Sequence, residues 1–191
     1  MAHNTQHNNN ANKKLSINQL KILQINVNSI ITNERRATLL DYLSKQKPDI
    51  ALLSETKLNP NHKINFKDYI ILRSNRPHAK QGGGTGILIR KDFSFKPIQP
   101  NSIKSNKCLE TTIIEINLQN NYKLYIIAAY ATCNYKKEFI PELKHLFEEL
   151  HLNNTKNFYL LAGDLNAKHQ TWGNTNINKR GISLHKWHTD Y

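Results

Sequence analysis

Short apolar runs alternate with polar stretches from Leu20 onward, and this alternation most limits the folds open to the chain. Runs of this length, rich in β-branched residues, are typical of strands. The runs at 108–118 and 122–130 indicate a hairpin that turns at Asn120-Asn121, because asparagine tolerates positive φ. Those at 21–28, 49–55 and 157–166 are predicted to be buried strands. The full set of predicted strands is 21–28, 49–55, 69–74, 85–91, 108–118, 122–130 and 157–166.

Two segments carry the apolar spacing of an amphipathic helix, 34–46 and 136–152. Pro48 ends the first of them. A further helix is expected in LHKWHTDY, after NKRGISL. Strands with interspersed helices and one antiparallel hairpin predict an α/β layered sandwich, with mixed, largely antiparallel sheets flanked by helices.

The chain of 191 residues has room for one folded domain. Residues 1–19 are polar and rich in asparagine, so we predict a disordered tail there and a single domain over 20–191. Cys108 and Cys133 match no zinc-ligand spacing and are expected to be free thiols in a reducing compartment.

The net charge is +13, from 27 basic and 14 acidic residues. Only Lys13 and Lys14 of these charges lie in the first 19 residues, so the excess belongs to the folded part. A basic domain attracts nucleic acid, although a lysine-rich surface encoded by an AT-rich genome has the same composition. Neither a membrane-length apolar run of roughly 18 residues nor a signal peptide is visible. An intracellular protein, nuclear or cytoplasmic, is expected.

Four of the apolar runs end in side chains that can bind a metal, a phosphate or a water. Carboxylates at the end of a sheet are costly to bury unless a cation lies among them. A magnesium ion fits, because it prefers oxygen ligands and keeps waters that can reach a phosphate. The residues concerned are Asn26, Glu55, Tyr130, Asp164 and Asn166.

Each of these residues, taken alone, has an ordinary structural explanation. Glu55 can pair with Lys57 or reach solvent, and Asn26 can form a turn. Tyr130 can be a core aromatic whose hydroxyl bonds to the backbone. Asp164 can make an Asx-turn within Gly-Asp-Leu-Asn. Only their combination favours a catalytic site.

The motifs QINVN, LLSET, AAY and GDLNAKHQTWG together resemble the endonuclease/exonuclease/phosphatase superfamily, which includes apurinic/apyrimidinic endonucleases and pancreatic deoxyribonuclease. Within it, the chain is most similar to the endonuclease domains of non-LTR retrotransposons, which GGGTGILIR, LETTIIEI and NKRGISL also indicate. The resemblance covers residues 20–187. It implies a DNA-nicking phosphodiesterase acting on double-stranded DNA, followed in the polyprotein by a reverse transcriptase.

The resemblance also implies a role for each strand-end residue. Glu55 would be the principal ligand of Mg²⁺, with Mn²⁺ as an alternative ion, and Asn26 would help to hold the metal or the phosphate. Tyr130 would contact the scissile phosphate. Asp164 would orient and deprotonate the attacking water, and Asn166 would steady the phosphate oxygens.

The basic, glycine-rich loop at 76–84 is expected to face DNA, with Arg76, His78 and Lys80 near phosphates. Its glycines lack the Lys-Ser/Thr of a P-loop and precede a strand rather than a helix.

Three further residues lie in the family-like segments. Glu110 is either a peripheral member of the site or part of a solvated face. His169 and Trp172 are expected to be scaffold for the segment that follows the catalytic strand.

Members of the superfamily continue into further strands that bring an Asp and a Ser-Asp-His, whereas this chain ends at Tyr191. His185 and His188 do not reproduce that motif. We therefore expect a domain that lacks its last strands and is impaired in nicking. One alternative is a non-catalytic, basic nucleic-acid-binding remnant, and another is a phosphatase for small phosphoesters, against which the net charge argues.

Overall fold

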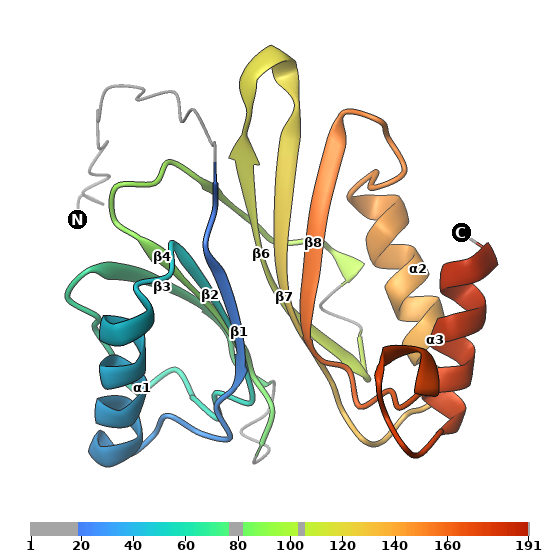
Figure 1. Cartoon of the computed structure of the whole chain (residues 1–191), viewed down its shortest axis with the longest axis horizontal. Coiled ribbons are helices and arrows are strands. Elements are labelled where there is room, and N and C mark those ends of the chain that lie inside the picture. Colours follow the sequence, from blue (N-terminus) through green and yellow to red (C-terminus); the bar gives the residue numbers. More distant parts are fainter. Residues whose placement is uncertain (1–18, 77–81, 103–105, 191) are drawn as a thin grey trace, which may run out of the picture.

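The computed structural model describes residues 19–76, 82–102 and 106–190. Two four-stranded mixed sheets face each other, and helices cover their outer faces (Figure 1). The prediction of a layered α/β sandwich is confirmed. Within the described ranges, no helix is long and apolar enough to cross a membrane.

The first sheet has the strand order β1-β2-β4-β3. β1 and β2 are parallel, and the other neighbours are antiparallel. Helix α1 connects β1 to β2 and packs on the outer face of this sheet through Leu39 and Leu43. The side chain of Thr32 caps its first turn. The elements are β1 (Ile22–Asn26), α1 (Asn33–Gln46), β2 (Ile50–Ser54), β3 (Tyr69–Ser74) and β4 (Thr85–Arg90).

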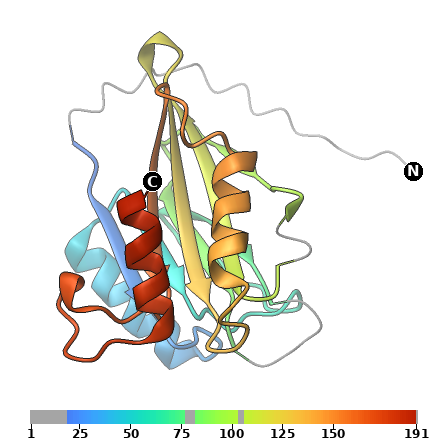
Figure 2. The ribbon, with the colours of Figure 1, turned by 90° about the vertical axis from the view of Figure 1, so that its right-hand side faces the viewer.

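The second sheet has the strand order β5-β6-β7-β8. β7 and β8 are parallel, and the other neighbours are antiparallel. Helices α2 and α3 lie side by side on its outer face (Figure 2). The β6–β7 hairpin turns at Asn120 and Asn121, whose φ angles are 55° and 60°, as predicted. The elements are β5 (Lys96–Ile98), β6 (Leu109–Asn117), β7 (Lys123–Ala131), α2 (Phe139–Glu149), β8 (Asn157–Asp164) and α3 (Lys179–Asp190).

The two sheets enclose an aliphatic core between them. Alternate residues of each strand point into this layer, as strand geometry requires. Burying each such side chain contributes roughly 1.5–3 kcal/mol. The buried residues are Ile50, Leu52, Ile87, Ile89, Ile114, Ile116, Ile126 and Ala128.

Two of the strands predicted to be buried, 21–28 and 157–166, are instead the outer strands β1 and β8 of their sheets, and their residues are half-buried or exposed. An apolar run shows that a strand packs on a core, but not how many neighbours it has. The helix predicted at 136–152 is shorter at both ends in the structure, where α2 spans Phe139–Glu149. The helix predicted in LHKWHTDY begins earlier, because α3 starts at Lys179. The predicted tail, apart from residue 19, lies outside the described residues.

Candidate active site

The strand ends that carry the predicted residues meet at one edge of the sandwich. Asn26 and Ser54 are partners in the β1–β2 register, and Tyr130 and Asp164 are partners in the β7–β8 register. Because both pairs are parallel, each brings two carboxyl ends to the same place. Contacts between β8 and both β1 and β2 bring the two pairs together.

The Asn26 side chain joins the two carboxylates of the site. Its Nδ2 lies 2.9 Å from Glu55 Oε1 and 2.8 Å from Asp164 Oδ2. Its Oδ1 accepts a hydrogen bond from the Asn28 main-chain N at 3.0 Å. Asn26 therefore also forms a turn, which is the ordinary structural role that its sequence allows. The Asn26 amide thus bonds to a residue that lies 138 positions away in the sequence.

Glu55 follows β2 in the left-handed backbone region, with φ of 57°. This conformation costs a residue with a Cβ roughly 1–2 kcal/mol, and such costs are common at functional sites. The Glu55 carbonyl accepts a hydrogen bond from Ser29 N at 2.7 Å, which holds the backbone there. Lys57 Nζ lies 3.7 Å from Glu55 Oε2, so the expected lysine partner is also present.

Asp164 and Asn166 form a tight turn after β8. Asp164 Oδ1 accepts a hydrogen bond from Asn166 N at 3.0 Å, which is an Asx-turn, while Oδ2 faces Asn26. Asn166 has φ of 50°, and its Nδ2 donates to Ala131 O at 2.9 Å. The turn therefore aims the carboxylate of Asp164 at Asn26 and ties Asn166 to the end of β7.

Tyr130 is only 7% exposed at the end of β7. Its burial, together with the nearby Glu55 and Cys133, raises the pKa of the phenol above its ordinary value, and Arg76 opposes part of this shift. The phenol therefore stays protonated at neutral pH and acts as a hydrogen-bond donor.

Arg76 contacts both Tyr130 and Glu110. Its guanidinium carbon lies 5.7 Å from the centre of the Tyr130 ring, and its Nε lies 2.6 Å from Glu110 Oε1. The Glu110 side chain is only 15% exposed, so it does not lie on a solvated face. His78 and Lys80, the other two residues predicted to face DNA, lie outside the described residues.

Ser54 connects the two sheets beneath the site and did not stand out in the sequence. Its side chain is 1% exposed. The hydroxyl donates to Ala129 O at 2.9 Å and accepts from Asp164 N at 3.1 Å. A serine within the apolar run IALLS was the available signal, because a buried hydroxyl requires partners.

Asn178 organises the segment after the turn that Asp164 and Asn166 form. Its Nδ2 donates to Asn166 O at 3.0 Å, and its Oδ1 accepts from Lys168 N at 3.1 Å and from Gly181 N at 2.7 Å. The last of these bonds caps the first turn of α3. An asparagine directly before the helix, in NKRGISL, was the signal for this role.

Arg180 is 4% exposed and forms the second anchor of α3. Its guanidinium donates to Thr132 O at 2.6 Å and to Leu165 O at 3.1 Å, and it lies over the Phe139 ring. It therefore joins the segment after β7 to the segment after β8. An arginine in a polar helix gave no sequence signal of burial.

The segment between β8 and α3 is built around His169 and Trp172. Trp172 Nε1 donates to Ala167 O at 3.1 Å. The His169 ring lies 4.3 Å from that of His185 on α3, centroid to centroid. These contacts hold the segment against the helix.

The two carboxylates of the site are ligands of the kind that divalent metal ions take. Glu55 and Asp164 present carboxylate oxygens to one place, next to the amide of Asn26. Across the described ranges, no group of three or more His, Cys, Asp or Glu side chains gathers in a way that could hold a metal. Mg²⁺ does not need such a cluster, because it is commonly held by one or two carboxylates and keeps several waters.

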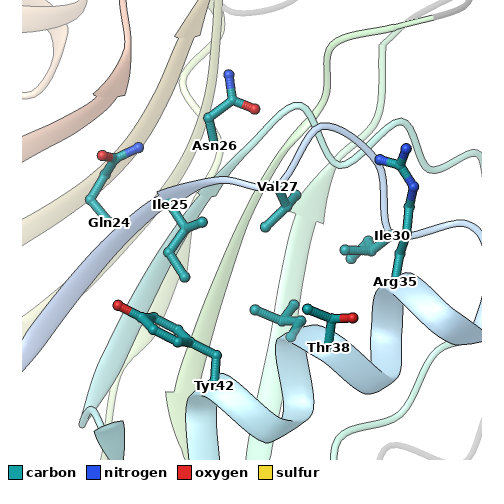
Figure 3. Close-up of a pocket in the computed structure, with 9 residues that line it drawn as sticks. Gln24, Ile25, Asn26, Val27, Ile30, Arg35, Thr38 and Tyr42 are labelled. Carbon is teal, nitrogen blue, oxygen red and sulfur yellow. The ribbon is translucent and has the colours of Figure 1, made fainter.

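A separate cavity of about 480 Å³ lies between β1 and α1. Ile25, Asn26 and Val27 of the β1 segment and Tyr42 of α1 are among the residues that line it, and the Asn26 side chain points to the opposite side of the strand from Ile25 and Val27 (Figure 3). Neither carboxylate of the site lines this cavity. The Glu55 and Asp164 carboxylates therefore lie outside this cavity, although Asn26 is one of the residues that line it.

The sequence of the chain is similar to those of mobile-element proteins. The chain is 25% identical over 143 residues to "RNA-directed DNA polymerase from mobile element jockey" of Drosophila melanogaster, a match that covers 75% of the chain. It is 28% identical over 144 residues to the probable RNA-directed DNA polymerase from transposon X-element of the same species. The chain spans only 14% and 15% of the length of these curated relatives.

Solved structures share the fold. The endonuclease domain of TRAS1, a telomere-specific non-LTR retrotransposon, matches with a TM-score of 0.65 at 15% identity, covering 88% of this chain and 68% of that one. An AP endonuclease from Leishmania major matches with a TM-score of 0.66 at 15% identity, covering 85% and 60% of the two chains. The profile of the Endonuclease/Exonuclease/phosphatase family matches residues 23–191. The chain therefore belongs to this family, the one that its strand-end motifs resemble.

Proposed function

We propose that this chain is the endonuclease domain of a non-LTR retrotransposon polyprotein, and that it nicks double-stranded DNA with the help of Mg²⁺ or Mn²⁺. The observation that carries the proposal is the Asn26 side chain, whose Nδ2 lies within 2.9 Å of both the Glu55 and the Asp164 carboxylates. Such a constellation at strand ends suits phosphodiester hydrolysis. Family membership and the likeness to the endonuclease domain of TRAS1 support the same reaction, and the mobile-element relatives support the retrotransposon origin.

Each side chain has a distinct task in this proposal. Glu55, through its carboxylate, and Asn26, through Oδ1, would hold the metal, which would neutralise charge on a phosphate oxygen and polarise the phosphorus–oxygen bonds. Asp164 orients the attacking water and accepts its proton. Tyr130 donates its phenol proton in a hydrogen bond to the scissile phosphate. Asn166 donates from its amide to a phosphate oxygen, while a second hydrogen of the same amide stays on Ala131 O.

DNA as the substrate is supported by the charge of the chain. The +13 net charge would attract a polyanion over a long surface, which a small phosphoester does not require. Arg76 lies beside Tyr130, where it would neutralise a phosphate next to the one that is cut. The polyprotein partner in this proposal is a reverse transcriptase, because the relatives are named as RNA-directed DNA polymerases.

The same charge also supports a second function, a non-catalytic nucleic-acid-binding remnant, because binding to phosphates needs no intact cleavage site. Supercoiled-plasmid nicking in Mg²⁺ separates the two. The comparison includes the chain, a version extended by the next stretch of its reading frame, and Glu55→Ala in each. Asp41→Ala, which removes an exposed carboxylate on α1, is the matched control.

Nicking that Glu55→Ala abolishes and Asp41→Ala leaves unchanged would support the endonuclease. If only the extended version nicks, the reaction needs residues beyond Tyr191. If no version nicks while salt-sensitive DNA binding persists, the chain is a binding remnant and the endonuclease proposal is wrong.

A further inference from the structure

We propose that Glu110 is a positioning residue for the site: it holds the Arg76 guanidinium against Tyr130 and fixes the glycine turn that follows. This inference rests on the proposed function, because the group that it places would face a DNA phosphate. Glu110 would touch neither DNA nor metal and would act only through Arg76.

Glu110 lies in the same cross-strand row as two proposed catalytic residues. It is the register partner of Tyr130 across β6 and β7, and Tyr130 is the partner of Asp164 across β7 and β8. Register partners project to the same face of a sheet. The three side chains therefore share the face that meets the first sheet, at its catalytic end.

The two carboxylate oxygens of Glu110 have different partners. Oε1 accepts from Arg76 Nε at 2.6 Å, and Oε2 accepts from the main-chain N of Gly84. The Arg76 and Glu110 side chains are only 20% and 15% exposed, so water screens the pair weakly. The Glu110 carboxylate thus bonds to both the Arg76 guanidinium and the glycine turn.

The glycine turn packs directly on the guanidinium. A Cβ at Gly83 would lie 2.2 Å from Arg76 Nη2, so a side chain there would displace the guanidinium, and the φ of +64° also favours glycine. The turn is also bonded to the segment after β2, because Gly83 O accepts from Lys57 N at 2.8 Å and Gly84 O accepts from Thr56 N at 3.1 Å. Glu110 is therefore connected to the backbone that carries Glu55.

Arginine suits this place because its planar group can bond to a carboxylate through Nε and still lie over an aromatic ring. The charged and titratable groups that shift the pKa of Tyr130 are Glu55, Cys133 and Arg76, and its register partners Glu110 and Asp164 flank it on β6 and β8. A phosphate that accepts the Tyr130 hydrogen bond would lie beside the guanidinium. Without Glu110, the guanidinium loses the contact that sets its position.

The test uses Glu110→Gln and measures duplex DNA binding together with the ¹³Cζ resonance of Tyr130, assigned with Tyr130→Phe. Glu115→Gln is the matched control, because Glu115 lies on the same strand and accepts from Tyr125 Oη at 2.9 Å. Both substitutions remove one negative charge. If Glu110 only added negative charge near DNA, its removal would tighten binding.

We expect Glu110→Gln to weaken duplex binding several-fold. The slope of log K against log salt is negative, and it should become less steep by about 0.9, the value of one phosphate contact. Arg76→Gln should weaken duplex binding to the same extent, and the variant that carries both substitutions should bind no more weakly than either single variant. The Tyr130 resonance should shift in all three, whereas Glu115→Gln should move Tyr125 only. Arg76→Lys keeps the positive charge and should still shift the Tyr130 resonance. It therefore provides a second test if Glu110→Gln does not fold.

Tighter binding by Glu110→Gln, or an unmoved Tyr130 resonance in both Glu110→Gln and Arg76→Lys, would overturn the positioning role. Neither readout requires cleavage. Duplex binding without nicking, by the chain and by its extended version alike, would therefore count against the endonuclease and leave this inference standing. A chain that fails to bind duplex would count against the DNA substrate, and the Tyr130 resonance would still decide whether Glu110 positions Arg76.

Discussion

The hydroxyl of Ser54 on β2 accepts a hydrogen bond from the main-chain N of Asp164 on β8, at 3.1 Å, and donates to Ala129 O on β7 at 2.9 Å. One buried side chain thus fixes the strand end that carries a proposed catalytic carboxylate to the opposite sheet. The position of Asp164 depends on the packing of the two sheets, and not only on its own turn.

Replacing Ser54 by alanine should lower the free energy of unfolding by about 1–3 kcal/mol, because it leaves a buried amide and a carbonyl without their partner. Urea titration measures this change. Ser44→Ala on α1 is the control, since the Ser44 hydroxyl bonds within its own exposed helix, and its cost should stay within about 0.5 kcal/mol. Equal costs for the two variants would show that the inter-sheet bonds contribute little.

Gly163 cannot carry a side chain, because an added Cβ would lie 1.7 Å from Ala129 O on the neighbouring strand. Gly163→Ala should therefore force β7 and β8 apart, cost about 3 kcal/mol or more in stability and displace Asp164. Gly173→Ala provides a contrast. Nothing lies within 4 Å of its added Cβ, but φ is +84°, so the cost should be only about 1–2 kcal/mol of backbone strain.

Thermal unfolding of both glycine variants distinguishes the two costs. Gly163→Ala should have a markedly lower Tm than Gly173→Ala. If the order is reversed, the close approach of the two strands is relaxed in solution.

Much of the site was predictable from where apolar runs end. Glu55 follows β2 directly and Asp164 is the last residue of β8. Parallel pairing brings each of these strand ends beside a neighbouring strand end, and the packing of the two sheets brings the pairs together. Ser54 and Arg180 were not predictable in the same way. A short hydroxyl in a buried run and an arginine in a helix acquire their partners only when segments far apart in the sequence pack together.

The edges of the sheets were the least predictable part of the fold. The runs at 21–28 and 157–166 were predicted to be buried strands, yet β1 and β8 are outer strands whose residues are half-buried or exposed. Apolarity reflects packing on one or both faces of a sheet, whereas an outer position concerns the hydrogen-bonding direction in its plane. These two properties are independent.

Arg180→Lys should lower stability by about 2 kcal/mol or more, although the charge is kept. A lysine cannot reproduce the bonds to Thr132 O and Leu165 O together with the stacking on Phe139. Arg36→Lys on α1, where the guanidinium contacts Asn33 of the same helix, is the control and should be nearly neutral. Chemical denaturation compares the two, and a neutral Arg180→Lys would contradict the anchoring role of Arg180.

The two cysteines should differ in reactivity. Cys108 is buried, and its burial raises the pKa of the thiol to about 11, whereas Cys133 is exposed. A thiol reagent at pH 8 should therefore label one cysteine in the native chain and two in urea, and Cys133→Ser should abolish the native reaction. Rapid native labelling of the Cys133→Ser variant would show that the α2 side of the second sheet opens readily.

Alkaline pH should destabilise the fold. Burial raises the pKa of Cys108 from 9.0 to about 11, and burial with the Glu115 hydrogen bond raises that of Tyr125 from 10.0 to about 12. The folded state therefore holds protons that the unfolded chain has already released. The stability due to these groups is complete below pH 9 and is lost as the pH rises through 11 and 12.

The urea midpoint should accordingly be level below pH 9 and fall steadily above it. Cys108→Ala and Tyr125→Phe remove the titrating groups, so each variant should show a shallower alkaline fall, even where its stability at pH 8 is lower. Because the effect depends on the difference between the two states, the slope and not the absolute midpoint is the measurement that matters. A wild-type midpoint that stays constant from pH 9 to 11 would mean that Cys108 and Tyr125 titrate normally, and that the core beneath α2 admits water.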